Sequence, residues 1–161
     1  MDHLWTPWRY SYLTKPKPLA GCIFCVASAA HEDAKNLIVY RGKLNFIMLN
    51  LYPYTTGHLM IAPYRHVATL AESPEDSLAE MMSLMKRAEV NLRATYRPDG
   101  LNLGMNVGAS AGAGVADHIH MHVVPRWTGD ANFVSTIGET RVMPEELTIT
   151  YERLAKLPWE K

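Results

Sequence analysis

Three histidines at alternate positions are the residues of this chain most able to do chemistry. They lie in the run Asp117-His-Ile-His-Met-His-Val-Val124, as His118, His120 and His122. Because successive side chains of a β-strand point to opposite faces, a strand here would gather the three imidazoles on one face and turn the apolar residues between them toward the core. A neutral imidazole is a nucleophile or a metal ligand, and a charged one is a general acid. The spacing therefore predicts a strand over 118–124 that carries a reactive site.

The residues just upstream could hold an anion beside these histidines. The segment from Asn106 to Gly114 consists mostly of small residues and includes Gly112. Glycine lets the backbone approach a ligand closely, and successive N–H groups in such loops form an anion-binding nest. A tight turn between two strands would explain the same composition. Neighbouring imidazoles disfavour protonation of His120, so a loop of this kind before a neutral, nucleophilic histidine suits displacement at phosphorus.

The rest of the pattern predicts the elements that position these groups. Short apolar runs between turn residues indicate strands, and their close spacing favours antiparallel pairing. Apolar residues recur at helical spacing after Ser73, the expected N-cap, and Pro98 ends this long helix. The predicted strands are Leu37–Tyr40, Asn45–Leu51, His58–Ala62, Leu101–Val107 and His118–Val124, the last stopped by Pro125, and Pro144–Leu154 is a predicted short terminal helix. This order indicates an α+β fold with an antiparallel sheet.

Composition limits the kinds of partner. The 161 residues fit one domain, over 21–161, preceded by an aromatic-rich arm over 1–20. Lys+Arg and Asp+Glu both number 16, so no global field favours nucleic acid or an anionic membrane, and neither is an expected partner. The first residues, Met1–Trp5, do not read as a signal peptide, so we expect a cytoplasmic location.

Cys22 and Cys25 form a C-x-x-C pair. The pair alone is an incomplete metal site, because a structural zinc needs four ligands. Two reduced, buried thiols are the plainer interpretation. Thioredoxin-like redox chemistry is disfavoured, because no strand followed by a helix surrounds the pair.

The triad and its surroundings resemble one family. His-φ-His-φ-His-φ-φ, where φ is apolar, is the signature of the histidine triad family of nucleotide hydrolases and transferases. The segments Phe46–Asn50 and Pro53–Pro63 and the Asn106-x-Gly108 entry to the glycine loop are similar to the family's preceding strands, over about Gly21 to Trp127. Val124–Phe133 and the Leu4–Arg9 arm resemble bacterial diadenosine tetraphosphate phosphorylases and hydrolases. The resemblance implies a HIT-like fold, with a five-stranded antiparallel sheet that continues across a homodimer.

The resemblance also implies roles for the reactive residues. His120 would attack the α-phosphorus of a nucleotide and form a nucleotidyl-histidine intermediate. His122 would hydrogen-bond the same phosphate, and His118 would orient the reactive ring or bind a metal. His58 would support the triad from behind. The implied substrate-binding residues are Asn50 at the ribose, Asn106, Gly112 and Gly114 at the phosphates, and Trp127 near phosphate or base. Several relatives have Gln or Ser near position 114, where this chain leaves only backbone donors.

The same resemblance completes the metal site and names a substrate. Some family members bind zinc through two cysteines, a later histidine and the first triad histidine, which here are Cys22, Cys25, His66 and His118. No organic cofactor is implied. The implied activity is cleavage of a dinucleoside polyphosphate, with diadenosine tetraphosphate as the first choice, and release of the intermediate by phosphate or water. The alternatives are a nucleoside phosphoramidate hydrolase of the same family and a non-catalytic nucleotide sensor.

Overall fold

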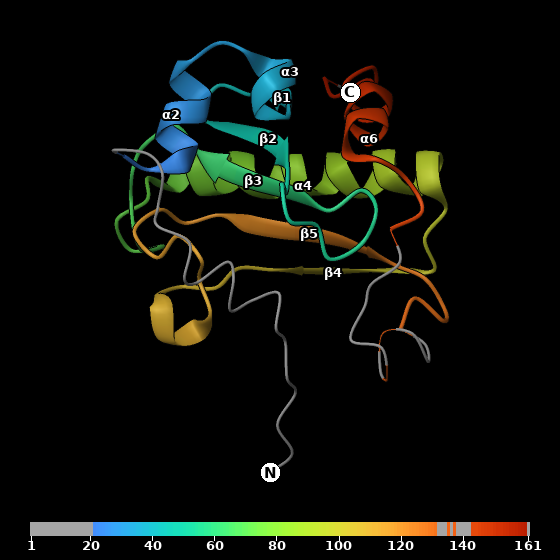
Figure 1. Ribbon diagram of the computed structural model, residues 1–161. Coiled ribbons are helices and arrows are strands. Elements are labelled where there is room, and N and C mark those ends of the chain that lie inside the picture. Colours follow the sequence, from blue (N-terminus) through green and yellow to red (C-terminus); the bar gives the residue numbers. More distant parts are fainter. Residues whose placement is uncertain (1–20, 132–134, 136, 138–142, 161) are drawn as a thin grey trace.

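An antiparallel sheet of five strands forms the centre of the protein in the computed structural model, which describes residues 21–131, 135, 137 and 143–160 (Figure 1). The strands are β1 (Ile38–Arg41), β2 (Asn45–Leu49), β3 (Leu59–Pro63), β4 (Gly100–Gly104) and β5 (Met121–Arg126), in the spatial order β1-β2-β3-β5-β4. This confirms the expected α+β architecture. The predicted arm over 1–20 lies outside the described residues, as do Asn132 and Phe133.

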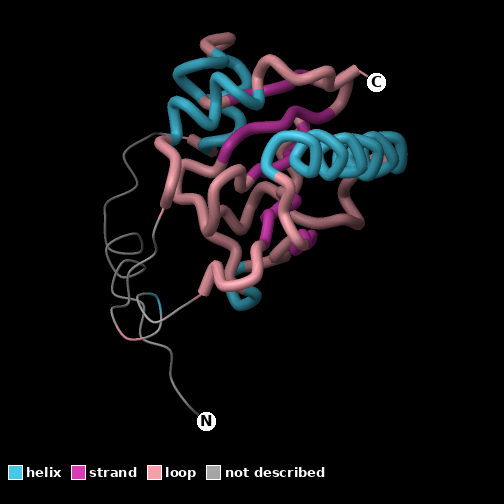
Figure 2. The backbone as a smooth tube through the Cα atoms, turned by 90° about the vertical axis from the view of Figure 1, so that its right-hand side faces the viewer, coloured by secondary structure: helices cyan, strands magenta, loops and turns pink. Residues whose placement is uncertain are grey.

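One face of the sheet packs on two helices, α4 (Glu75–Tyr96) and α6 (Leu147–Leu154). The core between them contains alternate residues of the strands, such as Ile47, Leu49 and Ile61, together with Met81 and Leu92 of α4. Figures 1 and 2 show α4 running along this face. Period-two burial on the strands and helical spacing on α4 therefore meet in one apolar layer.

The opposite face is covered near one end by α2 (Ile23–Ala29), which is followed by α3 (Asp33–Asn36). Phe24 and Ala27 of α2 pack against a second apolar cluster that includes Phe46 and Met60 of the strands. The sequence interpretation missed both helices, because β-branched residues and the C-x-x-C pair obscure α2 and the four residues of α3 are too few to show a helical pattern. This face also carries the triad histidines, so α2 lies beside the reactive groups.

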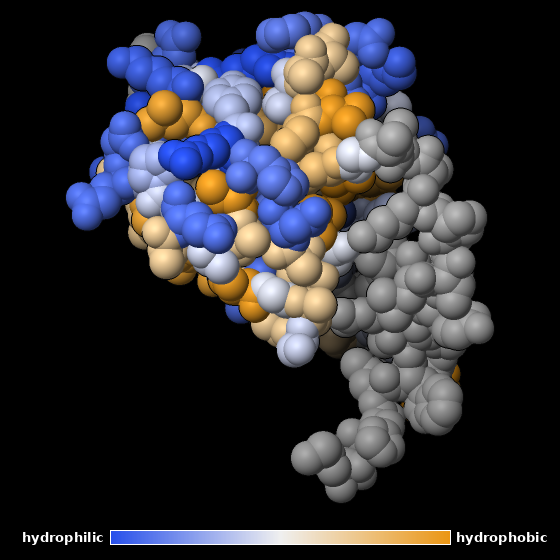
Figure 3. Space-filling model, turned by 90° about the vertical axis from the view of Figure 1, so that its left-hand side faces the viewer, coloured by the Kyte–Doolittle hydropathy of each residue, from blue (hydrophilic) through white to orange (hydrophobic). Residues whose placement is uncertain are grey.

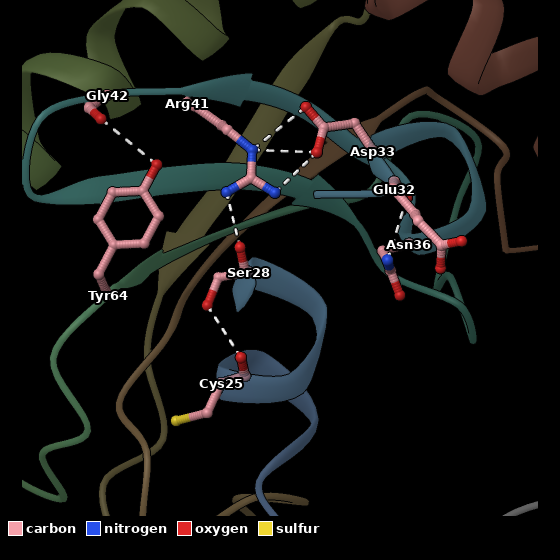
Figure 4. Close-up of polar contacts among 8 residues, drawn as sticks. All are labelled: Cys25, Ser28, Glu32, Asp33, Asn36, Arg41, Gly42 and Tyr64. Atoms are coloured by element: carbon pink, nitrogen blue, oxygen red, sulfur yellow. Dashed lines mark hydrogen bonds and ion pairs between the residues drawn. The ribbon is translucent and has the colours of Figure 1, made fainter. Parts of the chain in front are cut away.

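Arg41 of β1 fastens α2 and α3 to the sheet (Figure 4). Its guanidinium donates to the Asp33 carboxylate through Nε and Nη2 at 2.7–3.2 Å, and its Nη1 donates to the Ser28 carbonyl at 2.8 Å. A forked donor that engages a carboxylate and a carbonyl together fixes both segments in one geometry. Arg41 thereby holds the helix that carries Cys25.

Several predicted boundaries move. Helix α4 begins at Glu75 with Pro74 as its N-cap, not Ser73, because the Ser73 hydroxyl donates to the Thr69 carbonyl at 3.2 Å instead of capping. The helix ends at Tyr96, and Arg97 adopts a left-handed conformation before Pro98. The terminal helix begins later than predicted, at Leu147.

The fifth strand differs most from its prediction of 118–124. The ladder begins at Met121 and continues to Arg126, because the segment before it bonds elsewhere: Ile119 N–H donates to the Val67 carbonyl at 2.8 Å. Pro125 does not stop the strand. β3 pairs with β5 only from Met121 to Val123. The Pro125 carbonyl faces that side of β5 and accepts the Thr55 hydroxyl at 2.8 Å. Because no strand pairs with this side at Pro125, the missing proline N–H removes no ladder bond.

β4 is a terminal strand of the sheet, and residues 102–104 are exposed. Among the described residues no strand pairs with the outer edge of β4, and a homodimer with a continuous sheet stays a prediction. Among the described helices, none combines the length and the apolar composition that a bilayer-crossing segment needs.

Replacing Arg41 should loosen α2 and α3. We expect Arg41→Ala to lower the free energy of unfolding by about 1–2 kcal/mol in urea titrations, since a charge-assisted bond network that is only partly exposed is lost. Lys35→Ala is the matched control, because the Lys35–Glu32 pair is exposed and should contribute at most about 0.5 kcal/mol. Equal losses of unfolding free energy in the two variants would contradict the proposed role of Arg41 in holding α2 and α3.

Candidate active site

The three triad histidines lie on one face of the extended segment that leads into β5. His118 is fully buried and His120 is 4% exposed, while Ile119 and Val123 point into the core on the opposite side. The rings of His120 and His122 meet edge to face, with centroids 4.9 Å apart. The predicted alternation therefore holds even though residues 118–120 lie outside the strand ladder.

One hydrogen bond fixes the proton of the central histidine. Nδ1 of His120 lies 2.9 Å from the main-chain carbonyl of His118. A carbonyl only accepts, so Nδ1 must carry the hydrogen, and the neutral ring then has its lone pair on Nε2. Burial lowers the pKa of His120, although the bond to the carbonyl opposes that change. The ring is thus held in the neutral form, with a nucleophilic Nε2.

A chain of hydrogen bonds fixes the opposite tautomer in His122. The main-chain N–H of Tyr54 donates to Nδ1 of His58 at 3.1 Å, so the proton of a neutral His58 lies on Nε2. His58 Nε2 lies 2.9 Å from Nδ1 of His122, which must accept. His122 therefore carries its hydrogen on Nε2, at the far side of its ring from His58. The structure thus places His58 in hydrogen-bond contact with His122, and its role in supporting the triad stays a prediction.

Burial lowers the pKa of His122 to about 4, and repulsion from His120 adds to the effect. At neutral pH His122 is consequently uncharged, and its Nε2–H is a hydrogen-bond donor rather than a strong acid. The site therefore pairs a lone pair on one ring with a donor on the next. An electrophile bearing a partly negative oxygen, such as a phosphoryl group, matches this pair.

Asn50 lies beside His58, and Asn106 follows the end of β4. Asn50 accepts the Tyr52 N–H on Oδ1 at 2.9 Å and turns Nδ2 toward Nδ1 of His58 at 3.4 Å. The β4–β5 ladder ends where Gly104 pairs with His122, so Asn106 follows the ladder by two residues. The contact of Asn106 with phosphate stays a prediction.

The glycine-rich loop contains a 3-10 turn, η1 (Ala109–Ala111). Gly108 and Gly112 flank it with φ of 86° and 92°, a backbone conformation that favours glycine. The Gly112 N–H donates to the Ala109 carbonyl at 2.9 Å, so this amide is already engaged within the turn. The loop leads through Gly114 back to His118, and its role as a phosphate cradle stays a prediction.

Trp127 is half-buried in the turn that follows β5. Its main-chain N–H donates to the Asp130 carboxylate at 3.1 Å. The same carboxylate binds the Arg126 guanidinium at 2.6 and 2.9 Å, and that guanidinium also donates to Asn102 at 2.7 Å. Arg126 is therefore committed to holding this turn, which places Trp127 beyond the His122 end of the triad.

Two aromatic residues at the site escaped the sequence interpretation. The Phe24 ring packs on His118 and His120, with centroids 5.0 and 4.8 Å away. Tyr54 packs on His58 at 4.7 Å and on His122 at 6.0 Å. Phe24 lies between the two cysteines and Tyr54 lies in the turn after Pro53, so neither stands in a pattern that would have singled it out.

A second cluster lies at the α2 end of the triad. The ligating atoms of Cys22, Cys25, His66 and His118 all lie within 4.8 Å of one another. Figure 3, which looks at the α2 end of the molecule, shows polar and apolar residues interspersed there. The His66 side chain is 45% exposed, so the cluster is close to solvent. The four residues predicted as a metal site are thus brought together.

The chemistry of this cluster fits a tetrahedral cation. His118 donates Nε2–H to the Pro63 carbonyl at 2.9 Å, so its Nδ1 has a lone pair, and that atom lies 3.2 Å from Nδ1 of His66. Three of the four sulfur-to-nitrogen distances are 3.3–3.6 Å, and the fourth, from Cys22 to His66, is within 4.8 Å. A zinc ion with bonds of about 2.0–2.3 Å would separate its ligands by roughly 3.3–3.8 Å. Converging lone pairs at such spacing fit a bound dication.

Comparison with known proteins identifies a family. The family model described as HIT domain matches residues 31–129, which is more than half of the chain and includes the triad, His58 and His66. The chain belongs to the HIT family. The confirmed sheet topology agrees with this assignment.

Three HIT relatives illustrate the similarity. AP-4-A phosphorylase of Mycobacterium tuberculosis is 41% identical over 169 residues, covering 100% of this chain and 86% of its own length. A histidine triad nucleotide-binding protein of Sulfolobus tokodaii superposes with a TM-score of 0.68 at 28% identity, covering 84% of this chain and 90% of its own. A Zn-bound histidine triad family protein of Mycobacterium smegmatis gives 0.67 at 28% identity, covering 84% and 91%.

Proposed function

We propose that this HIT-family chain cleaves dinucleoside polyphosphates, with diadenosine tetraphosphate as the first substrate, through a nucleotidyl intermediate on His120. The observation that carries the proposal is the 2.9 Å bond between His120 Nδ1 and the His118 carbonyl, which leaves Nε2 as the nucleophile. Full-length similarity to the M. tuberculosis protein named AP-4-A phosphorylase supports the choice of substrate.

The first step exchanges one bond to phosphorus for another. The lone pair of His120 Nε2 forms a bond to the α-phosphorus, and the bond from that phosphorus to the bridging oxygen breaks. The electron pair leaves with the oxygen, so diadenosine tetraphosphate would release ATP and leave adenylyl-His120. His122 donates its Nε2–H to a phosphoryl oxygen and stabilises the charge that grows there. The departing polyphosphate is a stable anion and needs no strong acid.

The second step releases the nucleotide from His120. An oxygen of inorganic phosphate attacks the same phosphorus, the bond to Nε2 breaks, and ADP leaves while the ring regains its lone pair. Attack by water would give AMP instead. Phosphate is the proposed acceptor, because the similarity to the phosphorylase spans the whole chain. Asn106 and the loop that ends at Gly114 are the proposed contacts for phosphate oxygens, Asn50 for the ribose and Trp127 for phosphate or base.

Product identification tests this function. Diadenosine tetraphosphate with inorganic phosphate should give ADP and ATP in equal amounts by mass spectrometry, and AMP with ATP would identify water as the acceptor. In the same assay His120→Ala should lower kcat by at least about 10³-fold, because the attacking atom is gone, while nucleotide binding persists. His31→Gln is the control, since His31 is exposed and lies outside the site.

The function fails if the wild type cleaves no dinucleoside polyphosphate. It fails equally if ADP forms without phosphate, which would mean cleavage at the centre of the tetraphosphate, or if His120→Ala retains wild-type turnover.

We also propose that the four-residue cluster binds zinc. Zinc would supply a crosslink between α2 and the segment before β5, and no step of the reaction passes through it. Zinc would hold the His118 ring in place, and the main-chain carbonyl of the same residue orients His120. The Zn-bound M. smegmatis relative and the donor set support this assignment.

Metal analysis tests the zinc site. Purified protein should contain one zinc per chain by elemental mass spectrometry, and Cys22→Ser or Cys25→Ser should lose it and unfold several degrees lower, because a metal bound by the native fold adds its binding energy to stability. His31→Gln should retain the metal. The assignment is wrong if the purified wild type contains no zinc and its unfolding temperature changes neither on chelation nor on addition of zinc.

A further inference from the structure

The loop between β2 and β3 presents large exposed apolar side chains, of which Tyr54 reaches the His122 end of the site. Leu51 is 59% exposed, Tyr52 53% and Tyr54 38%, and Leu51 borders a cavity on the α6 side of the loop. Large exposed apolar patches mark surfaces that contact a ligand. The loop lies beside β5 (Figure 1), and the Thr55 hydroxyl bonds the Pro125 carbonyl at 2.8 Å.

The loop is held firmly, so this surface has a defined position. Asn50 N–H donates to the His58 carbonyl at 3.0 Å, and His58 N–H donates to the Thr55 carbonyl at 3.2 Å. Gly57, with φ of 78°, turns the chain against Leu92 of α4, where a Cβ would meet that side chain at 3.2 Å. A rigid loop costs little ordering entropy when a ligand binds to it.

Tyr54 is the member of this surface that touches the triad. Its ring lies nearly parallel to His122, at 24° and 6.0 Å between centroids, and it also contacts His58 at 4.7 Å. The proposed mechanism uses the Tyr54 main-chain N–H, and the Tyr54 side chain is 38% exposed. A partly exposed aromatic ring beside a phosphate-binding donor is suited to stacking on a nucleobase.

A second apolar surface lies at the other end of the histidine row. Phe24 contacts His118 and His120, and the neighbouring α2 residues Ile23 and Val26 are 46% and 38% exposed. The nucleophile therefore lies between an apolar surface on α2 and another on the β2–β3 loop. A substrate with a base at each end of a polyphosphate matches two such surfaces, whereas a mononucleotide needs only one.

We propose that Tyr54 stacks on the base of the departing nucleotide and so determines the preference for dinucleoside over mononucleoside polyphosphates. This rests on the proposed function. The proposal requires the retained nucleotide to lie on the α2 side of His120. The departing chain then passes His122 toward the loop and the Trp127 turn, where Tyr54 is the aromatic residue in contact with the triad.

Two substrates that differ only in the departing group test the proposal. Diadenosine tetraphosphate and adenosine 5′-tetraphosphate share the attacked adenylyl group, but the second has no departing base. The measured quantity is the ratio of their kcat/KM values, in the wild type, in Tyr54→Leu and in Tyr54→Phe. Leucine keeps apolar bulk but loses the π-face, and phenylalanine keeps the π-face but loses the hydroxyl.

The ratio should fall about tenfold in Tyr54→Leu and stay within about twofold in Tyr54→Phe, because stacking on one base is lost only in the former. A ratio that does not change in Tyr54→Leu overturns the proposal, including the case in which both rates fall together, since that is the mark of a ring that only positions His122. A wild type that cleaves neither substrate contradicts the proposed function itself, and the role of Tyr54 falls with it.

Discussion

The hydrogen bond from His120 Nδ1–H to the main-chain carbonyl of His118 determines which nitrogen of the central histidine carries a lone pair. That carbonyl has a fixed direction because the His118 side chain is held on both sides of its ring. Nε2–H donates to the Pro63 carbonyl, and Nδ1 faces the cysteines and His66. His118 thus contacts the cluster of Cys22, Cys25 and His66 through its side chain and the His120 ring through its main-chain carbonyl.

Burial of so many imidazoles is costly unless each polar atom finds a partner. His58 resolves this for one half of the site, because it accepts a backbone N–H on Nδ1 and donates from Nε2 to His122. The position of each ring hydrogen in this series of hydrogen bonds follows from the Tyr54 main-chain N–H, which can only donate. Burial also lowers the pKa of His120 and His122, so the reactive rings stay neutral where an ordinary histidine would begin to charge.

The sheet, the long helix and the one-sided row of histidines could be predicted from the sequence, because period-two and helical patterns report directly which face is buried. The start of β5 could not, since Ile119 is apolar and alternates as a strand residue should, yet its N–H bonds Val67 rather than β3. Pro125 misled in the opposite direction, because a proline is harmless on a strand whose neighbour has ended.

Parts of the site were also beyond sequence reasoning. The C-x-x-C pair pointed to a metal only through a family resemblance, because His66 and His118 are distant in sequence and only the fold brings them to the cysteines. Phe24 and Tyr54 were missed since contacts between rings depend on tertiary packing. Arg41 was missed because nothing in β1 indicates that its guanidinium spans two helices.

Long-range ¹H–¹⁵N correlation spectra of the histidine rings test the central claim most directly, since they distinguish the two nitrogens of each imidazole. At pH 7 the account predicts His120 as the neutral Nδ1–H tautomer and His122 as the neutral Nε2–H tautomer. At pH 6 His122 should still be neutral, because its pKa is about 4. A hydrogen on Nε2 of His120, or a His122 that is charged at pH 6, would contradict the account.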